Sequence, residues 1–383
     1  MNKWGILSGI RPVKLVKEML LNGDIDPVST FIATYGVSKE KAELSYDIAQ
    51  REIGVMKDIG ENDIGLYIGI PFCRSRCAYC SFITDACVNH EELFEPYVEM
   101  LKKEIEYSKE IIDKAGFNVV AAYMGGGTPT AIPANLIDDI LSTVRRLFPG
   151  IKEFTVEAGR ADTITYEKLL AIKNNNISRI CINPQTLNDD ILKTIGRRHT
   201  VADFMQCYKM AKDMGFGHIN TDLIAGLPSD TLDNFKDSVD NIIKLGPSSI
   251  TVHTLSVKRG SVIHEKPELY PLPSAEDVHK MIEYSYNTLT NNGYNPYYLY
   301  RQKNMLGNLE NIGYAKEGYE SIYNIMMMEE TSTIISLGAG GVSKTVNLKE
   351  KRINRVFNFK EPHNYISGID EILGRKDELL KKY

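Results

Sequence analysis

The sequence lacks any long apolar run and any strong excess of charge of one sign. Its hydrophobic stretches fall well short of the roughly 20 residues that a transmembrane helix needs. The opening segment, Met1-Asn-Lys-Trp-Gly, lacks the apolar core of a secretory signal peptide, so a cytoplasmic location is expected. The formal net charge of -5 argues against a nucleic-acid or anionic-membrane surface over the whole protein.

Cysteine is also scarce, with six in 383 residues. This is too few for the disulfide framework of a small secreted domain. Three of the six, Cys73, Cys77 and Cys80, stand close together, which favours metal binding in a reducing compartment. Cys181 lies in an apolar run and Cys207 in a helical pattern, so both are expected to be buried as small hydrophobic residues.

The clustered cysteines follow an apolar, strand-like run that ends at Pro71. Their C-x3-C-x2-C spacing suits three irons of a four-iron, four-sulfur (4Fe-4S) cluster and leaves the fourth iron open to another ligand. A structural zinc site is the alternative, with the ligands Cys77, Cys80, Cys87 and His90. The zinc set would leave Cys73 unused, and the position of the trio after a predicted strand favours the cluster.

From residue 66 onward, short apolar runs alternate with helical patterns. The expected strands are Leu66–Ile70, Val119–Met124, Phe154–Glu157, Arg179–Asn183, His218–Ile224 and Ser249–Leu255. The expected helices are Glu91–Lys114, Pro133–Leu147, Thr165–Asn174, Asn188–Ile195, Val201–Met214 and Ser229–Leu245. This alternation predicts an α/β fold with a parallel sheet. Since a closed TIM barrel needs eight such units, we expect a partial (β/α)6 TIM-like barrel, open on one side.

The texture of the sequence predicts three parts. Residues 1–60 form an N-terminal helical segment, and residues 61–260 form the barrel. Residues 261–383 form a C-terminal α+β accessory region that covers the substrate, with tyrosine-rich strands and glycine-rich loops. The final stretch, Glu371–Tyr383, is predicted to be a charged helix with a solvated face.

Polar residues come after the predicted strands, where the reacting groups of such barrels collect. The second strand ends in Gly125-Gly-Gly-Thr-Pro129, whose glycines let a ligand approach the backbone; a simple tight turn is the alternative. Glu157, Gln185, Arg197 and Asp222 come next in order. Together these side chains suit a zwitterionic amino acid joined to a ribose and a base. An acid can bind the ammonium group, the arginine can bind the carboxylate, and the amide and the second acid can bind the ribose hydroxyls.

These motifs together resemble one known family. They are Tyr67-x-Gly-Ile-Pro-Phe-Cys, the cysteine trio, Gly-Gly-Gly-Thr-Pro, Glu157, Gln185, Gly-Arg197 and Asp222-Leu-Ile-x-Gly-Leu-Pro. The order and spacing, over residues 66 to 345, resemble the oxygen-independent coproporphyrinogen III oxidase family of radical SAM enzymes. Residues 1–60 and the segment Tyr297-Tyr-Leu-Tyr-Arg-Gln-Lys-Asn look most like its HemZ-type branch.

The resemblance assigns roles to the matching positions. It implies a 4Fe-4S cluster on Cys73, Cys77 and Cys80. It also implies one or two molecules of S-adenosylmethionine (SAM), lined by Tyr67, Tyr79, Gly126, Gly127, Thr128, Glu157, Gln185, Arg197, Asp222 and Val342. No catalytic side chain is expected beyond the cluster ligands, because hydrogen abstraction by a SAM-derived radical needs no general acid or base.

The implied reaction converts two propionates of coproporphyrinogen III to vinyl groups, which gives protoporphyrinogen IX for haem biosynthesis. The implied partners are this tetrapyrrole substrate and a flavodoxin- or ferredoxin-like electron donor, and we expect a monomer with no nucleic-acid or membrane partner. Another radical SAM reaction on a tetrapyrrole, such as methyl transfer or haem modification, is an alternative. A haem-binding carrier without turnover is a second alternative.

The sequence departs from the family's pattern in three respects. Gly69 and Phe82 stand where well-known members have histidine and a fourth cysteine, and the His-Asn-x-x-Tyr-Trp stretch of the haem-chaperone branch is absent. A tetracarboxylate substrate would also need cations, for which Arg301, Lys303 and Arg160 are the candidates. The alternative for Arg301 is that it stacks on its aromatic neighbours.

Overall fold

The computed structural model describes residues 3–7, 11–81, 90–347, 350 and 352–381. The chain forms two compact units, each built from segments far apart in the sequence. The first unit comprises residues 1–59, 185–195 and 220–329, and the second comprises residues 60–184, 196–219 and 330–383. The predicted division into residues 1–60, 61–260 and 261–383 stays a prediction, because each compact unit combines segments from more than one of these parts.

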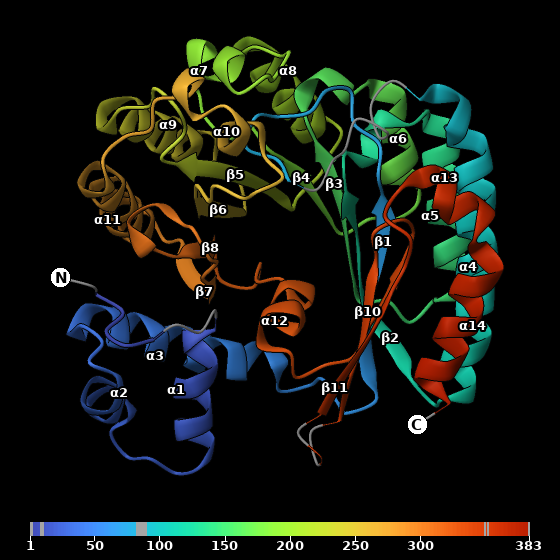
Figure 1. The fold of residues 1–383 in the computed structure, drawn as a ribbon, viewed down its shortest axis with the longest axis horizontal. Helices are drawn as coiled ribbons and strands as arrows, with labels where there is room; N and C mark the ends of the chain where they lie inside the picture. The colour runs from blue at the N-terminus through green and yellow to red at the C-terminus, as the bar shows by residue number, and fades with distance from the viewer. Residues whose placement is uncertain (1–2, 8–10, 82–89, 348–349, 351, 382–383) are drawn as a thin grey trace. The chain divides into compact units, whose positions relative to one another are not determined.

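The second unit contains the cysteine trio and is built on a mostly parallel sheet (Figure 1). Its strands are β1 Asp63–Ile70, β2 Asn118–Gly126, β3 Glu153–Gly159, β4 Arg179–Ile182, β9 Ile334–Leu337, β10 Val342–Asn347 and β11 Arg352–Phe357. They lie in the order β11-β10-β9-β1-β2-β3-β4, with β10 antiparallel to both β9 and β11. Its helices are α4 Phe94–Lys114, α5 Ala134–Leu147, α6 Tyr166–Asn174, α8 Val201–Asp213, α13 Pro362–Ser367 and α14 Ile369–Leu380.

The first unit contains hydrogen-bonded strands in the order β5-β6-β8-β7. Its strands are β5 Ile219–Ala225, β6 Ser249–Thr254, β7 Asn295–Tyr300 and β8 Asn311–Ala315, and only the β5–β6 pair is parallel among these described strands. Its helices are α1 Pro12–Leu21, α2 Pro27–Tyr35, α3 Lys39–Met56, α7 Asp189–Thr194, α9 Leu232–Leu245, α10 Val262–Glu265, α11 Ala275–Asn291 and α12 Ile322–Glu329.

Local sequence explains where these helices begin. Thr200 caps α8 through a reciprocal capping box with Asp203, and Thr231 and Ser274 cap α9 and α11 by accepting backbone N–H bonds. Buried Ile137, Ile140 and Leu141, spaced at helical intervals, give α5 one apolar face. Strands and helices alternate as predicted, with boundaries within a few residues. The predicted fold class is therefore confirmed.

The predicted charged C-terminal helix is present as α14, with Glu371 and Glu378 exposed on its solvated face, but its opposite face is buried. Ile372, Leu379 and Lys376 of α14 are buried, and Figure 1 shows α14 beside α4 in the second unit. The sequence is misleading here because α14 carries many charges, and one of them, Lys376, points into the core. No described helix is long and apolar enough to cross a membrane.

A buried network around Glu104 of α4 anchors the loop between β9 and β10. The Glu104 carboxylate accepts hydrogen bonds from the backbone N–H of Gly338 (2.7 Å), the Asn358 amide (2.8 Å) and the Tyr365 hydroxyl (2.5 Å). Lys376 lies 3.1 Å from the same carboxylate, so a buried charge is compensated by a buried cation. The network ties α4, α13 and α14 to the loop that precedes Val342.

Replacing Lys376 with methionine should therefore destabilise the protein by about 3 kcal/mol, because Glu104 would keep a buried charge without its cation. Urea unfolding monitored by circular dichroism measures the free energy of unfolding. Lys381→Met, just after the last residue of the same helix, removes an exposed pair with Asp377 and should leave the free energy of unfolding nearly unchanged. Equal losses in the two variants would contradict this role of Lys376.

A second stability prediction concerns Asp230, which is buried in the first unit. One carboxylate oxygen accepts the N–H of Thr231 at 2.8 Å, and the other has no hydrogen-bond partner among the described protein atoms. Burial raises the pKa of Asp230 from 3.8 to about 7. The folded state thus binds this proton more tightly than the unfolded state does. Its contribution to stability is complete below pH 3.8 and is lost as the pH rises toward 7.

Asp230→Asn should remove this loss and raise the free energy of unfolding at pH 8 by on the order of 2 kcal/mol relative to the unmodified protein, with little change at pH 4. Chemical unfolding curves measured across pH 4 to 8 test this. A gain of the same size at both ends of the range would show that titration of Asp230 is not the cause.

Candidate active site

The three clustered cysteines lie in the loop after β1. Cys77 is buried and Cys73 and Cys80 are half-buried, and none of the three forms a disulfide. A turn in which the N–H of Cys80 donates to the carbonyl of Cys77 at 3.0 Å sets the spacing of the last two. Burial is the main cause that raises the pKa of the Cys73 thiol to about 12, and the neighbouring Cys77 and Cys80 contribute to this increase.

The glycine run after β2 holds this cysteine loop by its backbone. The N–H groups of Gly127 and Thr128 donate to the carbonyls of Ile70 and Phe72 at 2.7 and 2.8 Å. A Cβ atom on Gly127 would lie 2.5 Å from the carbonyl oxygen of Phe72, so only glycine permits this approach. These two donors, which the sequence suggested for a ligand, are thus used by the protein itself. The Thr128 hydroxyl lies 3.4 Å from the sulfur of Cys73.

Glu157 of β3 groups with Tyr123 and Tyr67 of the neighbouring strands. The Tyr123 hydroxyl donates to the Glu157 carboxylate at 2.5 Å, and the Tyr67 and Tyr123 rings stack with centroids 6.4 Å apart. Burial raises the pKa of Tyr67 well above its ordinary value, and the charge of Glu157 adds to the effect, so Tyr67 is a neutral hydrogen-bonding group. Tyr123 is a member of this group that the sequence reasoning did not name. Alternation along β2 could have found it, because Tyr123 precedes the glycine run by two residues.

Arg197 is buried beside Tyr79, which lies between two of the cysteines in sequence. Its guanidinium donates to the carbonyl of Asn183 at 2.5 Å and to the Tyr79 hydroxyl at 3.2 Å. Burial alone would lower the pKa of Arg197, but Tyr79 and Cys77 raise it, so the side chain stays charged. Its Nε has no hydrogen-bond partner among the described protein atoms. The side-chain oxygen of Asn183 is likewise buried without a described partner.

Arg160 lies in the same unit, just after β3, and is paired with Asp162. The guanidinium donates to both carboxylate oxygens of Asp162, at 3.0 and 2.9 Å. Another of its nitrogens donates to the carbonyl of Ser75 at 2.9 Å and to the sulfur of Cys77 at 3.6 Å. A propionate of a substrate was one predicted partner for Arg160, whereas these contacts commit its nitrogens to Asp162 and the cysteine loop.

Gln185 and Asp222 belong to the first unit, where their backbones pair. The N–H of Gln185 donates to the carbonyl of Asp222 at 2.9 Å, with Gln185 in a left-handed conformation (φ 70°). The Asp222 carboxylate accepts from the Asn220 amide at 2.7 Å and lies 3.6 Å from the imidazole of His253. The side-chain oxygen of Gln185 has no described partner. A shared site between these two residues and the cysteine loop therefore stays a prediction.

The remaining predicted residues have varied surroundings. Val342 begins β10 and is 37% exposed. Arg301 is buried in the first unit, lies over the ring of Trp4 (5.2 Å to the centroid) and donates to Asn308 at 2.6 Å. The stacking alternative for Arg301 is therefore the one that the structure bears out, and Lys303 is exposed. Cys181 and Cys207 are buried, as predicted.

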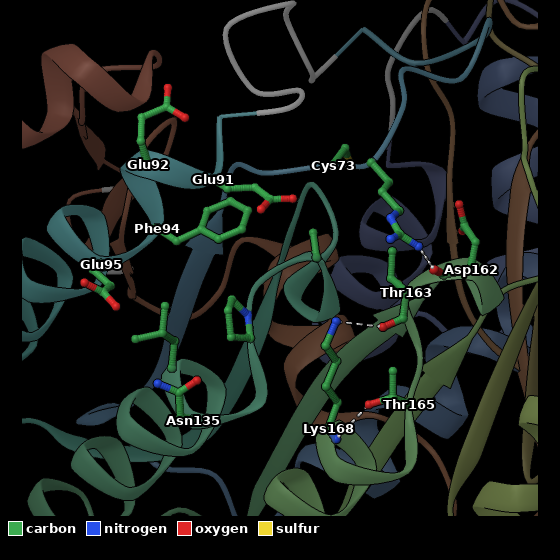
Figure 2. Close-up of a pocket in the computed structure, with 14 residues that line it drawn as sticks. Cys73, Glu91, Glu92, Phe94, Glu95, Asn135, Asp162, Thr163, Thr165 and Lys168 are labelled. Atoms are coloured by element: carbon green, nitrogen blue, oxygen red, sulfur yellow. Dashed lines mark hydrogen bonds between the residues drawn. The ribbon is translucent and has the colours of Figure 1, made fainter.

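Figure 2 shows a pocket of about 480 Å³ beside Cys73. Glu91, Glu92 and Glu95 stand on one side of it, and Asp162, Thr163 and Lys168 on the other. The pocket's two basic residues are engaged with backbone carbonyls: Arg74 donates to Asp162 at 2.7 Å, and Lys168 donates to Thr130 and Thr163 at 2.6 and 3.1 Å. Because several carboxylates line this pocket and its two basic side chains already bind backbone carbonyls, it is poorly suited to binding the carboxylates of a substrate.

The residues of the second unit fit the cofactors that the sequence implies. Cysteine thiolates are the usual ligands of a 4Fe-4S cluster, which normally has four of them, and three would leave one iron without a protein ligand. Arg197 Nε and the Asn183 side-chain oxygen are buried polar atoms without described partners, which a bound polar cofactor would satisfy. In the described part of the chain, no three His, Cys, Asp or Glu side chains, the cysteine trio included, lie close enough to hold a single metal ion. In a 4Fe-4S cluster each cysteine binds a different iron. Cys87 and Phe82 lie outside the described residues, so the zinc alternative that uses Cys87 is not tested.

This geometry predicts that Arg197→Lys weakens SAM binding at least about tenfold, because lysine cannot replace a charge-assisted hydrogen bond from Nε. Anaerobic equilibrium dialysis with labelled SAM measures the dissociation constant. Arg198→Lys changes the adjacent, exposed arginine in the same way and should leave the affinity unchanged. Unaltered affinity in the Arg197 variant would contradict a contact between this guanidinium and SAM.

Comparison with known proteins places this geometry in a family. Residues 67–242 match the family model of the radical SAM superfamily. The chain is 40% identical to the oxygen-independent coproporphyrinogen-III oxidase-like protein HemZ of Bacillus subtilis, over 99% of this chain and 77% of that protein. It is 29% identical to the haem chaperone HemW of the same species, over 74% of this chain and 72% of that protein.

Solved structures support the fold. Coproporphyrinogen III oxidase (HemN) of Escherichia coli, described as a radical SAM enzyme, superposes with a TM-score of 0.63 at 20% sequence identity, over 86% of this chain and 72% of that one. Membership of the radical SAM superfamily implies a 4Fe-4S cluster and SAM as cofactors. The chain belongs to the oxygen-independent coproporphyrinogen III oxidase-like family of radical SAM enzymes, in its HemZ-type branch.

Proposed function

We propose that this protein catalyses the oxygen-independent oxidative decarboxylation of coproporphyrinogen III, converting two propionates to vinyl groups to give protoporphyrinogen IX. The observation that carries the proposal is the 40% identity over 99% of the chain to a coproporphyrinogen-III oxidase-like protein. In each round the substrate propionate would give one hydrogen atom to the SAM-derived radical and one electron to an external one-electron acceptor, and would release carbon dioxide.

The protein's own residues would bind and shield the cofactors. Cys73, Cys77 and Cys80 would hold the cluster, and with three protein ligands one iron stays open for SAM. When bound, the cluster and SAM supply the one-electron chemistry that removes a hydrogen atom from a substrate carbon. Arg197 would hold the carboxylate of SAM, and the glycine run would keep the cysteine loop closed against β2.

Glu157 would bind the ammonium group of SAM, since the Tyr123 hydroxyl already orients its carboxylate by a hydrogen bond of 2.5 Å. The neutral Tyr67 beside it would offer a hydroxyl without adding charge. Gln185 and Asp222 would contact the ribose hydroxyls. These side chains bind and orient, and no proton transfer by the protein is required.

A haem-carrier function is the second candidate. It is favoured by the 29% identity to a haem chaperone over 74% of this chain. The two candidates share the cluster and differ in turnover. A carrier would bind haem without cleaving SAM, whereas the oxidase would consume SAM for each propionate.

Anaerobic incubation of the reconstituted protein with coproporphyrinogen III, SAM and dithionite separates these functions. The proposal predicts release of 5'-deoxyadenosine and formation of protoporphyrinogen, detected by mass spectrometry. Cys77→Ala should abolish both, while Cys181→Ala, which changes a buried cysteine of β4, should retain activity. Stable haem binding without SAM cleavage would favour the carrier, and a methylated or ring-opened product would overturn the proposed reaction.

A further inference from the structure

Arg160 stands out among the buried charges because it faces a predicted cluster ligand. Its side chain is 3% exposed. Gly159, with φ 66°, turns the chain at the end of β3, and Arg160 comes directly after it. Its guanidinium reaches the sulfur of Cys77 at 3.6 Å, a normal length for an N–H to sulfur contact, and the carbonyl of Ser75 at 2.9 Å.

The arrangement around Arg160 fixes its direction. Two parallel hydrogen bonds to Asp162 hold the planar group in one orientation, which a lysine could not reproduce. Burial alone would raise the pKa of Asp162, but the hydrogen bonds and charge of Arg160 lower it overall, so both partners stay charged. One edge of the guanidinium thus binds Asp162 while another nitrogen is left for the cysteine loop.

We propose that Arg160 is a positioning residue that holds Cys77 and raises the reduction potential of the 4Fe-4S cluster. Hydrogen bonds and positive charge near a cluster sulfur stabilise the reduced cluster, which carries one more negative charge. The Asp162 carboxylate offsets part of the positive charge, so the hydrogen bond to Cys77 and the nearness of the guanidinium carry the effect. Asp162 therefore contributes by orienting the guanidinium of Arg160 toward Cys77.

Arg160 would act on the electron that enters the cluster and not on the substrate. This role rests on the cluster assignment within the proposed function and is independent of coproporphyrinogen. The reduction potential of the cluster governs electron transfer from the external donor, so Arg160 would affect how readily the donor reduces the cluster. A purely structural role, as a clamp on Ser75, would leave the potential unchanged.

The test is an anaerobic redox titration of the reconstituted full-length protein, monitored by electron paramagnetic resonance without SAM or substrate. Arg160→Gln should lower the equilibrium constant for one-electron reduction of the cluster roughly threefold to tenfold. A tenfold decrease corresponds to a reduction potential lower by about 59 mV. Arg160→Lys keeps the charge and should recover part of the shift. Arg179→Gln removes another buried guanidinium of the same unit, which binds His218 at 2.7 Å, and should leave the potential unchanged.

Each outcome decides the inference. The inference would be overturned if the equilibrium constants for cluster reduction in the Arg160→Gln and unmodified proteins lie within twofold of each other. An equal shift in the Arg179 variant would also overturn it. If Arg160→Gln takes up no cluster, Arg160→Lys decides: a shift of at least twofold toward harder reduction supports the inference, and an unchanged potential overturns it. Absence of a 4Fe-4S cluster from the unmodified protein would overturn the cluster assignment too, whereas a normal cluster without coproporphyrinogen turnover would overturn only the proposed reaction.

Discussion

The site depends on a backbone contact between the end of β1 and the glycine run after β2. The parallel pairing of the two strands continues past Ile70, because the N–H groups of Gly127 and Thr128 donate to carbonyls on the segment that leads into Cys73. A side chain at position 127 would collide with this segment. The Gly-Gly-Thr motif is therefore required first for packing. It determines where the cysteine loop starts, and so where the sulfur atoms can lie.

Buried charges around this contact are compensated in pairs. Arg160 is matched by Asp162, and Glu104 by Lys376 together with three hydrogen-bond donors. A buried ion without a partner would cost several kcal/mol, so these pairs allow polar groups to lie inside the protein at fixed orientations. The Arg160 pair orients a donor toward a cysteine. The Glu104 pair fixes a loop between two strands of the sheet.

Much of the fold could be predicted from local sequence. Helical periodicity located the helices and strand-helix alternation indicated the α/β class, because both signals depend on neighbouring residues. The polar caps Thr231 and Ser274, which the structure shows at the starts of α9 and α11, are local signals of the same kind. The cysteine trio stood out by its spacing, and the glycine run, Glu157 and Arg197 stood out by their residue types in the segments that follow predicted strands. The trio, the glycine run and Glu157 all lie at or just beyond the end of an apolar run, where a parallel sheet presents its reacting groups.

Features that depend on distant segments were not predictable in this way. The contact from Arg160 to Cys77 joins residues 83 positions apart, and nothing in the sequence around Arg160 distinguishes it from a surface arginine. Lys376 reads as one charge among many in a polar helix, yet its partner is on α4. Arg301 was a candidate for a substrate carboxylate, with stacking on the tyrosines near it in sequence as the alternative. The ring that it lies over belongs to Trp4, near the start of the chain.

The central claim is that three cysteines hold a cluster with one iron open to SAM. Electron paramagnetic resonance of the reduced, anaerobically reconstituted protein, with iron and sulfide analysis before and after SAM is added, tests it most directly. The account predicts about four irons per chain and a reduced-cluster signal that SAM alters. Bound zinc in place of iron, or a cluster signal that SAM leaves unchanged, would contradict it.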